Sequence, residues 1–133
     1  MVAGPEKDAA LAAELRERGA TVRGYVEQAE LVRLLLGAAC LVQSSRHEGF
    51  GLPVLEAMAC GTPVVAVPEP ALIEVAGNAA VIVEEPDLAD GIRRAIAEHE
   101  ALRAAGLRRA RDFSWERTAE RTLEVYREAL GGS

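Results

Sequence analysis

The apolar residues of this chain alternate between short continuous runs and longer stretches with helical spacing. The short segments predict strands over residues 2–3, 21–23, 40–43, 64–67 and 80–83, and the apolar run within residues 40–43 predicts a buried one. The helical spacing predicts helices over residues 6–18, 27–38, 53–60, 71–76 and 87–102, and a last helix that begins after Ser114. Because strands and helices alternate, the sequence predicts a layered α/β fold with a parallel sheet.

Residues at the predicted helix ends support these boundaries. Gly19, Gly61 and Gly77 follow predicted helices, where a left-handed residue commonly closes the last turn. Pro53 suits a first turn, because its missing N–H costs nothing there. Ser114 is a favourable N-cap residue for the last helix.

Two patterns in the last third of the chain have ordinary structural explanations. The last predicted helix has one apolar face, which predicts packing against the core rather than contact with a cofactor, and the face consists of Trp115, Ala119, Leu123 and Tyr126. A basic cluster precedes it, which is expected to be a solvated helix face rather than a binding patch, and it consists of Arg103, Arg108, Arg109 and Arg111.

A loop bracketed by glycines lies between the strand predicted over residues 40–43 and the helix predicted over residues 53–60. Gly49 and Gly51 lack a Cβ atom, so the backbone there can adopt positive φ and approach a ligand closely. The loop leads into a helix N-terminus, where free backbone N–H groups and the positive end of the helix dipole face the same point. This arrangement favours an anionic ligand.

Two glutamates, Glu48 and Glu56, flank this loop eight positions apart. Glu48 is expected at the carboxyl edge of the sheet, where open α/β sheets bind ligands. Glu56 is expected in or near the first turn of the helix, where its carboxylate can accept two hydrogen bonds from a diol such as that of a ribose. Taken singly, Glu48 is better explained as a solvated loop acid and Glu56 as a favourable charge at a helix N-terminus. Together, around Gly-Phe-Gly, they favour a binding site.

The segment from Glu48 to Val65, EGFGLPVLEAMACGTPVV, resembles the signature of the retaining glycosyltransferases of family 4. That signature separates two glutamates by seven residues (EX7E) and is matched here without interruption. Gly24-Tyr25-Val26 upstream and Phe113-Ser114-Trp115 downstream also resemble the family, so the likeness covers nearly the whole chain. The resemblance implies an enzyme of the GT-B architecture. For this chain it implies the Rossmann-like C-terminal domain, a parallel sheet flanked by helices that binds a nucleotide-sugar donor.

Carried over by position, the resemblance implies a role for each residue of the motif. Glu48, the catalytic residue in this assignment, would contact hydroxyls of the donor sugar. Tyr25 and Val26 occupy the position of backbone contacts to the nucleobase. The family's reaction retains the anomeric configuration and requires no metal, so no metal or cofactor is expected. The residues that would bind the donor's sugar, diphosphate and ribose are Gly49, Phe50, Gly51, Leu52 and Glu56.

The resemblance begins partway into the family's C-terminal domain. We therefore expect residues 1–133 to form a single, incomplete donor-binding domain, without the N-terminal domain that binds the acceptor in the family. By itself the chain is then not expected to transfer sugar. The alternative is a non-catalytic nucleotide-binding or structural module that retains the fold. A glycosidase acid–base pair is less favoured, because such carboxylates must flank the scissile bond from opposite sides.

Composition narrows the class of partner. The formal net charge of −6 argues against nucleic acid, because phosphate neutralisation needs clustered Lys and Arg. No apolar run reaches the ~18 residues of a membrane span. Cys40 and Cys60 have no metal or redox spacing and are expected to be buried free thiols in a reducing cytoplasm. The expected partners are therefore a nucleotide-sugar donor and an acceptor of unknown identity.

An incomplete sheet also predicts self-association. The resemblance places a missing strand at the centre of the sheet. Either the strand at residues 2–3 pairs directly with the strand at residues 40–43, or strand edges stay unpaired. Unpaired edges recruit other chains, so we expect a homodimer.

Overall fold

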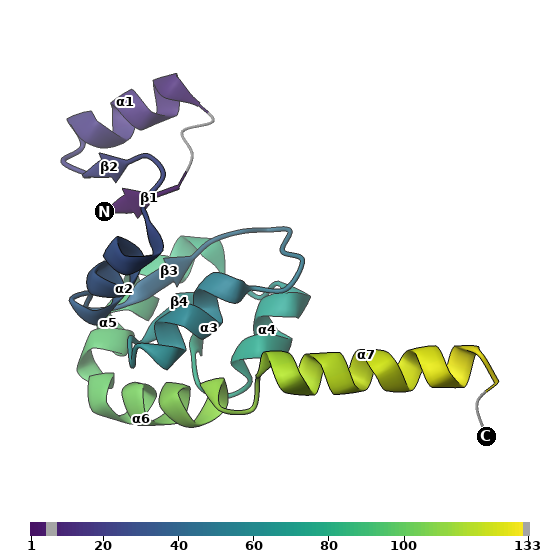
Figure 1. Cartoon of the computed structure of the whole chain (residues 1–133). Helices are drawn as coiled ribbons and strands as arrows, with labels where there is room; N and C mark the ends of the chain where they lie inside the picture. The colour runs from purple at the N-terminus through teal and green to yellow at the C-terminus, as the bar shows by residue number, and fades with distance from the viewer. Residues whose placement is uncertain (5–7, 132–133) are drawn as a thin grey trace. The chain divides into compact units, whose positions relative to one another are not determined.

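The computed structural model describes residues 1–4 and 8–131. The chain divides into two compact units, Met1–Leu34 (unit 1) and Leu35–Ser133 (unit 2). Each unit contains its own parallel sheet, with helices between the strands (Figure 1). The α/β class with parallel strands and flanking helices, which the alternating pattern predicts, is confirmed.

Unit 1 is built around a two-stranded parallel sheet. Its strands are β1 (Val2–Ala3) and β2 (Val22–Arg23), and Val2 lies opposite Val22. Both strands were predicted from the sequence.

The helices of unit 1 follow its strands. α1 (Ala9–Glu17) begins after Asp8, whose carboxylate accepts a hydrogen bond of 3.0 Å from the Leu11 amide. The predicted start of this helix at Glu6 lies outside the described residues. α2 (Gln28–Leu36) follows β2 and ends in unit 2.

Unit 2 contains a three-stranded parallel sheet in the order β3–β4–β5. The strands are β3 (Leu41–Gln43), β4 (Val64–Ala66) and β5 (Val81–Ile82). Because the strands are parallel, their carboxyl ends lie at one edge of the sheet. The helices of this unit are α3 (Leu52–Ala59), α4 (Pro70–Ala76), the short 3-10 helix η1 (Glu85–Asp87), α5 (Leu88–Ala97), α6 (His99–Ala110) and α7 (Trp115–Ala129).

The core of unit 2 surrounds β4. Val64, Val65 and Ala66 are fully buried, as expected of a strand that is covered on both faces. Figure 1 shows α3 in front of this sheet and α5 behind it. At Gly91, α5 approaches so closely that a Cβ atom would lie 2.9 Å from Cγ1 of Val65. Gly91 therefore sets the distance between this helix and the sheet.

The single helix predicted over residues 87–102 is wrong. The chain forms α5 and α6 instead, with a break at Glu98, whose backbone has φ −96° and ψ 19°. The break has a tertiary cause. α5 packs on the sheet through Gly91 and Ala95, whereas α6 packs on α3, where Gly106 lies against Met58. One straight helix cannot follow both surfaces.

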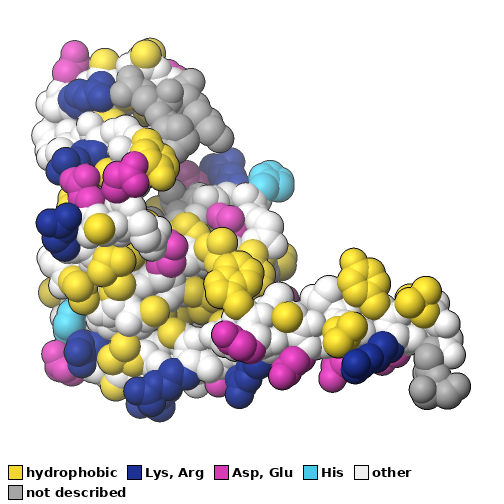
Figure 2. All heavy atoms as spheres, viewed as in Figure 1, with side chains coloured by type: hydrophobic (Ala, Val, Ile, Leu, Met, Phe, Trp, Pro, Cys, Tyr) yellow, Lys and Arg dark blue, Asp and Glu magenta, His cyan; other side chains and the backbone are white. Residues whose placement is uncertain are grey.

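The last helix has the predicted start but not the predicted environment. Oγ of Ser114 accepts a hydrogen bond of 3.2 Å from the Arg117 amide, so Ser114 is the N-cap of α7. None of the residues of α7, all of them described, is buried, and Trp115 is 77% exposed. The prediction that its apolar face packs against the core is therefore wrong. Figure 2 shows hydrophobic side chains along α7 at the surface, among charged ones.

No helix in the described part of the chain combines the length and the hydropathy of a membrane span.

Candidate functional site

The glycine-bracketed loop lies at the carboxyl edge of the sheet in unit 2. It connects β3 to the N-terminus of α3, and the loops that follow β4 and β5 lie at the same edge. Open α/β sheets bind ligands at this edge. These loops line an open cleft of about 430 Å³, whose walls are formed by Arg46, Val67, Pro68, Glu69, Pro70, Glu84, Glu85 and Pro86.

The two glycines of the loop have different surroundings. Gly51 has φ +92° and is the N-cap of α3, and a Cβ atom there would lie 3.0 Å from Cδ2 of Leu72. Among the described residues, no atom lies within 4 Å of the position that a Cβ atom would take on Gly49. Backbone conformation and packing therefore both require glycine at position 51. At position 49 the backbone faces open space, where a ligand can approach.

The N-terminus of α3 opens onto this loop. Within the described residues, no side chain caps this end of the helix, and Pro53 in its first turn has no N–H. The Val54 amide donates to the Gly51 carbonyl at 3.0 Å. The amides that precede it, from Gly49 to Leu52, are the candidate donors to an anion.

Glu48 is held by the last residue of β3. Nε2 of Gln43 donates to Oε2 of Glu48 at 2.9 Å and to Oγ of Ser45 at 3.0 Å. Both Gln43 and Glu48 are half-buried. The carboxylate has further lone pairs with which to accept hydrogen bonds from a ligand. Sequence reasoning did not single out Gln43, although a polar side chain at the end of an apolar strand was a signal for it.

Glu56 is the fifth residue of α3, so it lies at the start of the second turn, near the first turn as expected. The favourable effect of an acid on the helix dipole is confined to the first turn, so this position weakens the explanation of Glu56 as an N-terminal charge. The pKa of Cys60, one turn further along, is raised by burial and by the Glu56 carboxylate. Both cysteines are free and half-buried.

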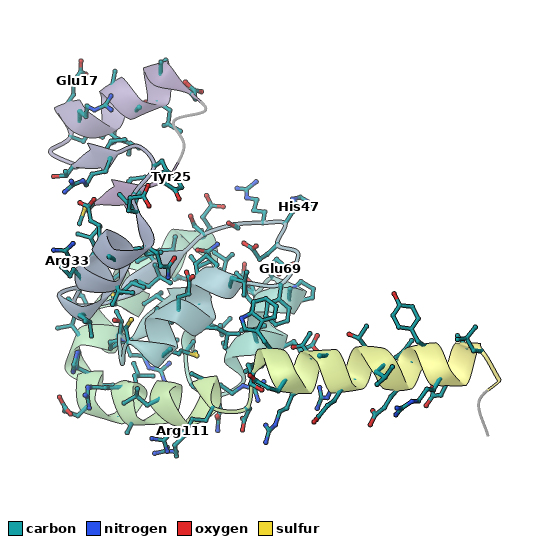
Figure 3. All side chains as sticks on the ribbon, in the orientation of Figure 1. Glu17, Tyr25, Arg33, His47, Glu69 and Arg111 are labelled. Carbon is teal, nitrogen blue, oxygen red and sulfur yellow. The ribbon has the colours of Figure 1, made fainter. Side chains whose placement is uncertain are left out.

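The tip of the loop is exposed, and a hydrogen bond connects it to the wall of the cleft that η1 forms. Nε of Arg46 donates to Oε2 of Glu85 at 3.1 Å, which connects the loop after β3 with η1. His47 is exposed on the same loop (Figure 3). Arg46 is thus already paired with a carboxylate.

Tyr25 and Val26 belong to unit 1, in the segment between β2 and α2. Tyr25 is 78% exposed (Figure 3) and Val26 is half-buried. Their role as contacts to a nucleobase stays a prediction.

Sequence reasoning missed a cluster that contacts the loop, formed by Phe50, Phe113 and Arg109. The ring of Phe50 meets the ring of Phe113, and the Arg109 guanidinium lies over the Phe113 ring. The Arg109 side chain is only 28% exposed, so the expectation of a solvated helix face is wrong for this residue. The spacing of the arginines contained no signal for the two backbone carbonyls that Arg109 binds, because both come from another helix, α4.

The profile of the family described as "Glycosyl transferases group 1" matches residues 2–112, which include the loop, both glutamates and the strands of both sheets. The chain belongs to the group 1 glycosyl transferases. Its curated relatives are named as transferases, so they lend no support to the alternative of a non-catalytic module.

Two relatives illustrate the likeness. O-antigen chain mannosyltransferase B of Escherichia coli is 39% identical over 111 residues, which covers 78% of this chain and 29% of the relative. D-inositol 3-phosphate glycosyltransferase of Nocardioides sp. is 42% identical over 141 aligned positions, which covers 94% of this chain and 31% of the relative. The chain thus spans under a third of the length of these two proteins.

Solved structures agree with the fold. Sucrose-phosphate synthase from Thermosynechococcus elongatus has a TM-score of 0.77 at 29% identity, over 92% of this chain and 34% of that chain. AviGT4, a glycosyltransferase involved in avilamycin A biosynthesis, has a TM-score of 0.67 at 28% identity, over 99% of this chain and 43% of that chain. These similarities support the Rossmann-like, GT-B-type fold that the motif implied.

Proposed function

We propose that the segment from Glu48 to Glu56 binds a nucleoside diphosphate sugar, the donor of a retaining and metal-independent sugar transfer of the family 4 type. The observation that carries the proposal is the open space at Gly49, in the loop that leads into the N-terminus of α3 and that Glu48 and Glu56 flank in the sequence. Backbone amides at a helix N-terminus bind phosphate groups. The hydroxyls of a sugar and of a ribose are donors to carboxylates.

The two glutamates bind different parts of the donor. Glu48 contacts the hydroxyls of the transferred sugar, and its hydrogen bond from Gln43 holds the carboxylate in one orientation before the sugar arrives. Glu56, on the second turn of α3, holds the ribose hydroxyls. The loop amides between them face the diphosphate.

The transfer itself needs no protein nucleophile in this proposal. The bond from the anomeric carbon to the diphosphate oxygen breaks, and the acceptor hydroxyl oxygen forms its bond on the same face of the sugar. The departing diphosphate accepts the proton of that hydroxyl. The amides from Gly49 to Leu52 stabilise the charge that develops on the diphosphate, and such preorganised donors commonly contribute the largest part of catalysis.

The names of the relatives support a class of donor. The similar proteins are named as a mannosyltransferase and as inositol-phosphate glycosyltransferases, so the proposed donor is a nucleoside diphosphate hexose.

Isothermal titration calorimetry tests the proposal. The chain is titrated with UDP, GDP and ADP, with their hexose conjugates, and with free glucose and mannose. We expect at least one nucleotide and its conjugate to bind and the free hexoses not to bind. Binding of the hexoses alone would contradict the proposal.

A matched pair of variants assigns the site. Glu56→Gln is expected to weaken binding of the nucleotide and of its conjugate by roughly tenfold, because a hydrogen bond to a charged group is lost. Glu100→Gln removes an exposed carboxylate on α6 and is expected to leave both dissociation constants unchanged. Equal losses of nucleotide affinity in the two variants would show that Glu56 does not bind the nucleotide.

A further inference from the structure

An aromatic contact connects the glycine-bracketed loop to the end of α6. The rings of Phe50 and Phe113 are arranged edge-to-face, with centroids 6.1 Å apart and planes at 84°. This geometry places the positive edge of one ring against the negative face of the other. Cζ of Arg109 lies 4.7 Å from the centroid of the Phe113 ring, within the range of a cation–π contact. Phe113 is thus held between Phe50 and Arg109.

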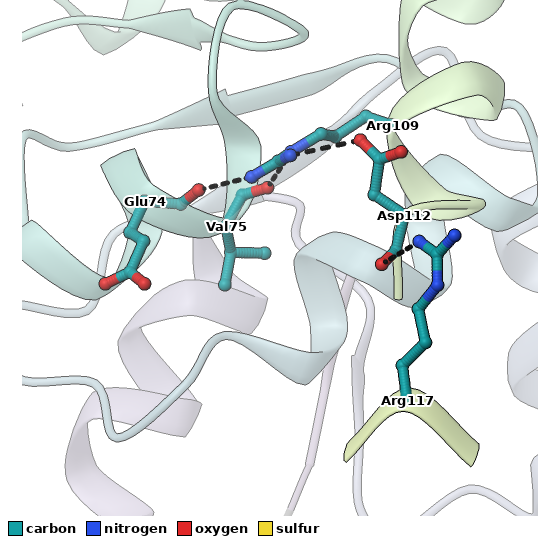
Figure 4. Close-up of polar contacts among 5 residues, drawn as sticks. All are labelled: Glu74, Val75, Arg109, Asp112 and Arg117. Atoms are coloured by element: carbon teal, nitrogen blue, oxygen red, sulfur yellow. Dashed lines mark hydrogen bonds and ion pairs between the residues drawn. The ribbon is translucent and has the colours of Figure 1, made fainter. Parts of the chain in front are cut away.

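The Arg109 guanidinium also binds the end of α4 (Figure 4). Nε donates to the Val75 carbonyl at 2.9 Å, and Nη2 donates to the Glu74 carbonyl at 2.7 Å. The last carbonyls of a helix have no partner within the helix, and a cation is favoured at this end of the dipole. Nη1 donates to Oδ2 of Asp112 at 3.1 Å. Each nitrogen of the guanidinium therefore has an acceptor.

The segment that carries Phe113 is fixed at its other end by α7. Nη1 of Arg117 donates to the Asp112 carbonyl at 3.0 Å, and the Arg117 amide donates to Ser114 (Figure 4 shows the first of these). The backbone on both sides of Phe113 is therefore restrained.

α4 provides a second route from Arg109 to the loop. Leu72 of α4 is fully buried, and its Cδ2 lies 3.0 Å from the position that a Cβ atom would take on Gly51. Phe113 contacts the loop at Phe50, and Leu72 contacts it at Gly51. Arg109 interacts with both of the elements that contact the loop. Its guanidinium lies over the Phe113 ring, and it binds two carbonyls of α4, the helix that contains Leu72.

We propose that Arg109 and Phe113 are positioning residues that hold the loop from Gly49 to Gly51 in the conformation that binds the donor diphosphate. The inference rests on the proposed function, because it takes this loop as the donor site. Neither residue touches the donor. They act through Phe50 and α4, by reducing the conformational freedom that the loop loses when a ligand binds.

Four variants separate this role from general stability. Arg109→Lys keeps the charge but removes the planar fork that reaches the carbonyls of α4. Phe113→Leu keeps an apolar side chain but removes the ring, and Phe113→Tyr restores the ring. Arg111→Lys is the matched control, because Arg111 is exposed at the end of the same helix (Figure 3).

Loop mobility is measured without any ligand, by ¹⁵N relaxation of the amides of Gly49, Phe50 and Gly51. Rigid backbone gives order parameters of about 0.85, and mobile backbone gives values below about 0.6. We expect rigid values in the wild type, Phe113→Tyr and Arg111→Lys, and mobile values in Arg109→Lys and Phe113→Leu. Unchanged order parameters in the last two variants would overturn the inference, whether or not the chain binds a nucleotide.

The link from the loop to the donor is measured by calorimetry with the nucleoside diphosphate that binds the wild type. We expect Kd to rise roughly fivefold to tenfold in Arg109→Lys and Phe113→Leu, as expected for one or two lost restraints, and to be restored in Phe113→Tyr. A mobile loop with an unchanged Kd would overturn the positioning role. If UDP, GDP and ADP all fail to bind the wild type, the proposed function fails, and the order parameters still decide whether Arg109 and Phe113 hold the loop.

Discussion

Nε2 of Gln43 donates a hydrogen bond of 2.9 Å to Oε2 of Glu48. Gln43 is the last residue of β3 and Glu48 precedes the first glycine of the loop, so the bond spans the exposed turn at Arg46 and His47. The orientation of the Glu48 carboxylate is therefore set by the sheet rather than by the turn. This distinguishes Glu48 from a solvated loop acid.

Gln43→Leu should disturb the sugar end of the site alone. Without the amide, the Glu48 carboxylate has more conformational freedom, and the expected loss is roughly fivefold to tenfold in affinity for the sugar conjugate. Affinity for the nucleoside diphosphate without the sugar should stay unchanged. Calorimetry with both ligands measures this difference. A parallel loss for the two ligands would show that Gln43 acts on the whole loop.

The two loop glycines should respond differently to alanine. Gly51→Ala places a Cβ atom at positive φ and 3.0 Å from Leu72, so we expect a lower melting temperature and weaker donor binding. The expected cost is roughly 1–3 kcal/mol, as for strained backbone. Gly49→Ala meets no described atom within 4 Å, so the melting temperature should hold while donor affinity falls.

Thermal melts followed by circular dichroism, together with calorimetry, separate these two cases. Unchanged donor affinity in Gly49→Ala would show that the ligand does not approach the backbone at this position. An unchanged melting temperature in Gly51→Ala would show that the loop relaxes away from Leu72.

Cys60 should report the charge of Glu56. Burial and the Glu56 carboxylate raise the pKa of Cys60, so removing the carboxylate in Glu56→Gln should lower that pKa. The thiolate is the reactive form. At a fixed pH near 8, alkylation of Cys60 by iodoacetamide should therefore be faster in Glu56→Gln than in the parent.

The rates are measured across pH in a Cys40→Ser background, so that only one thiol reacts. Glu100→Gln, on another helix, is the control and should leave the profile in place. If the pH profile of Cys60 does not move in Glu56→Gln, the carboxylate is not directed toward the second half of α3.

Gly91→Ala should destabilise the core of unit 2. The new Cβ atom would lie 2.9 Å from γ-carbons of Val65 and Val83, and these branched side chains have few alternative rotamers. Overpacking typically costs about 1–3 kcal/mol, which exceeds the gain of about 0.5–1 kcal/mol from replacing glycine within a helix. Urea denaturation measures the net change. In a Val83→Ala background, Gly91→Ala should lower the free energy of unfolding by less. An equal loss in that background would show that the clash with Val83 is not the cause.

Most of the secondary structure and the loop were predictable because their determinants are local. Positive φ at Gly51, Gly61 and Gly77 and the hydroxyl cap at Ser114 follow from the conformations that glycine and serine adopt within a few bonds. The buried strand at residues 64–66 follows from its own apolar side chains. The position of Glu48 after β3 follows from chain order.

The tertiary structure decided which surfaces meet. The helix break at Glu98 arises because α5 must pack on the sheet and α6 on α3, and neither surface is visible in the residues around position 98. Arg109 donates to two carbonyls of α4, more than thirty positions away in the sequence. The residues next to it in the sequence could not reveal these partners. The apolar face of α7 shows the same limit, because spacing reveals that a face is apolar but not whether another element covers it. The sequence alone determined most of the elements and the glycine-bracketed loop at the start of α3. The contacts that hold this loop depend on residues brought together from separate elements, and only packing in three dimensions determines them.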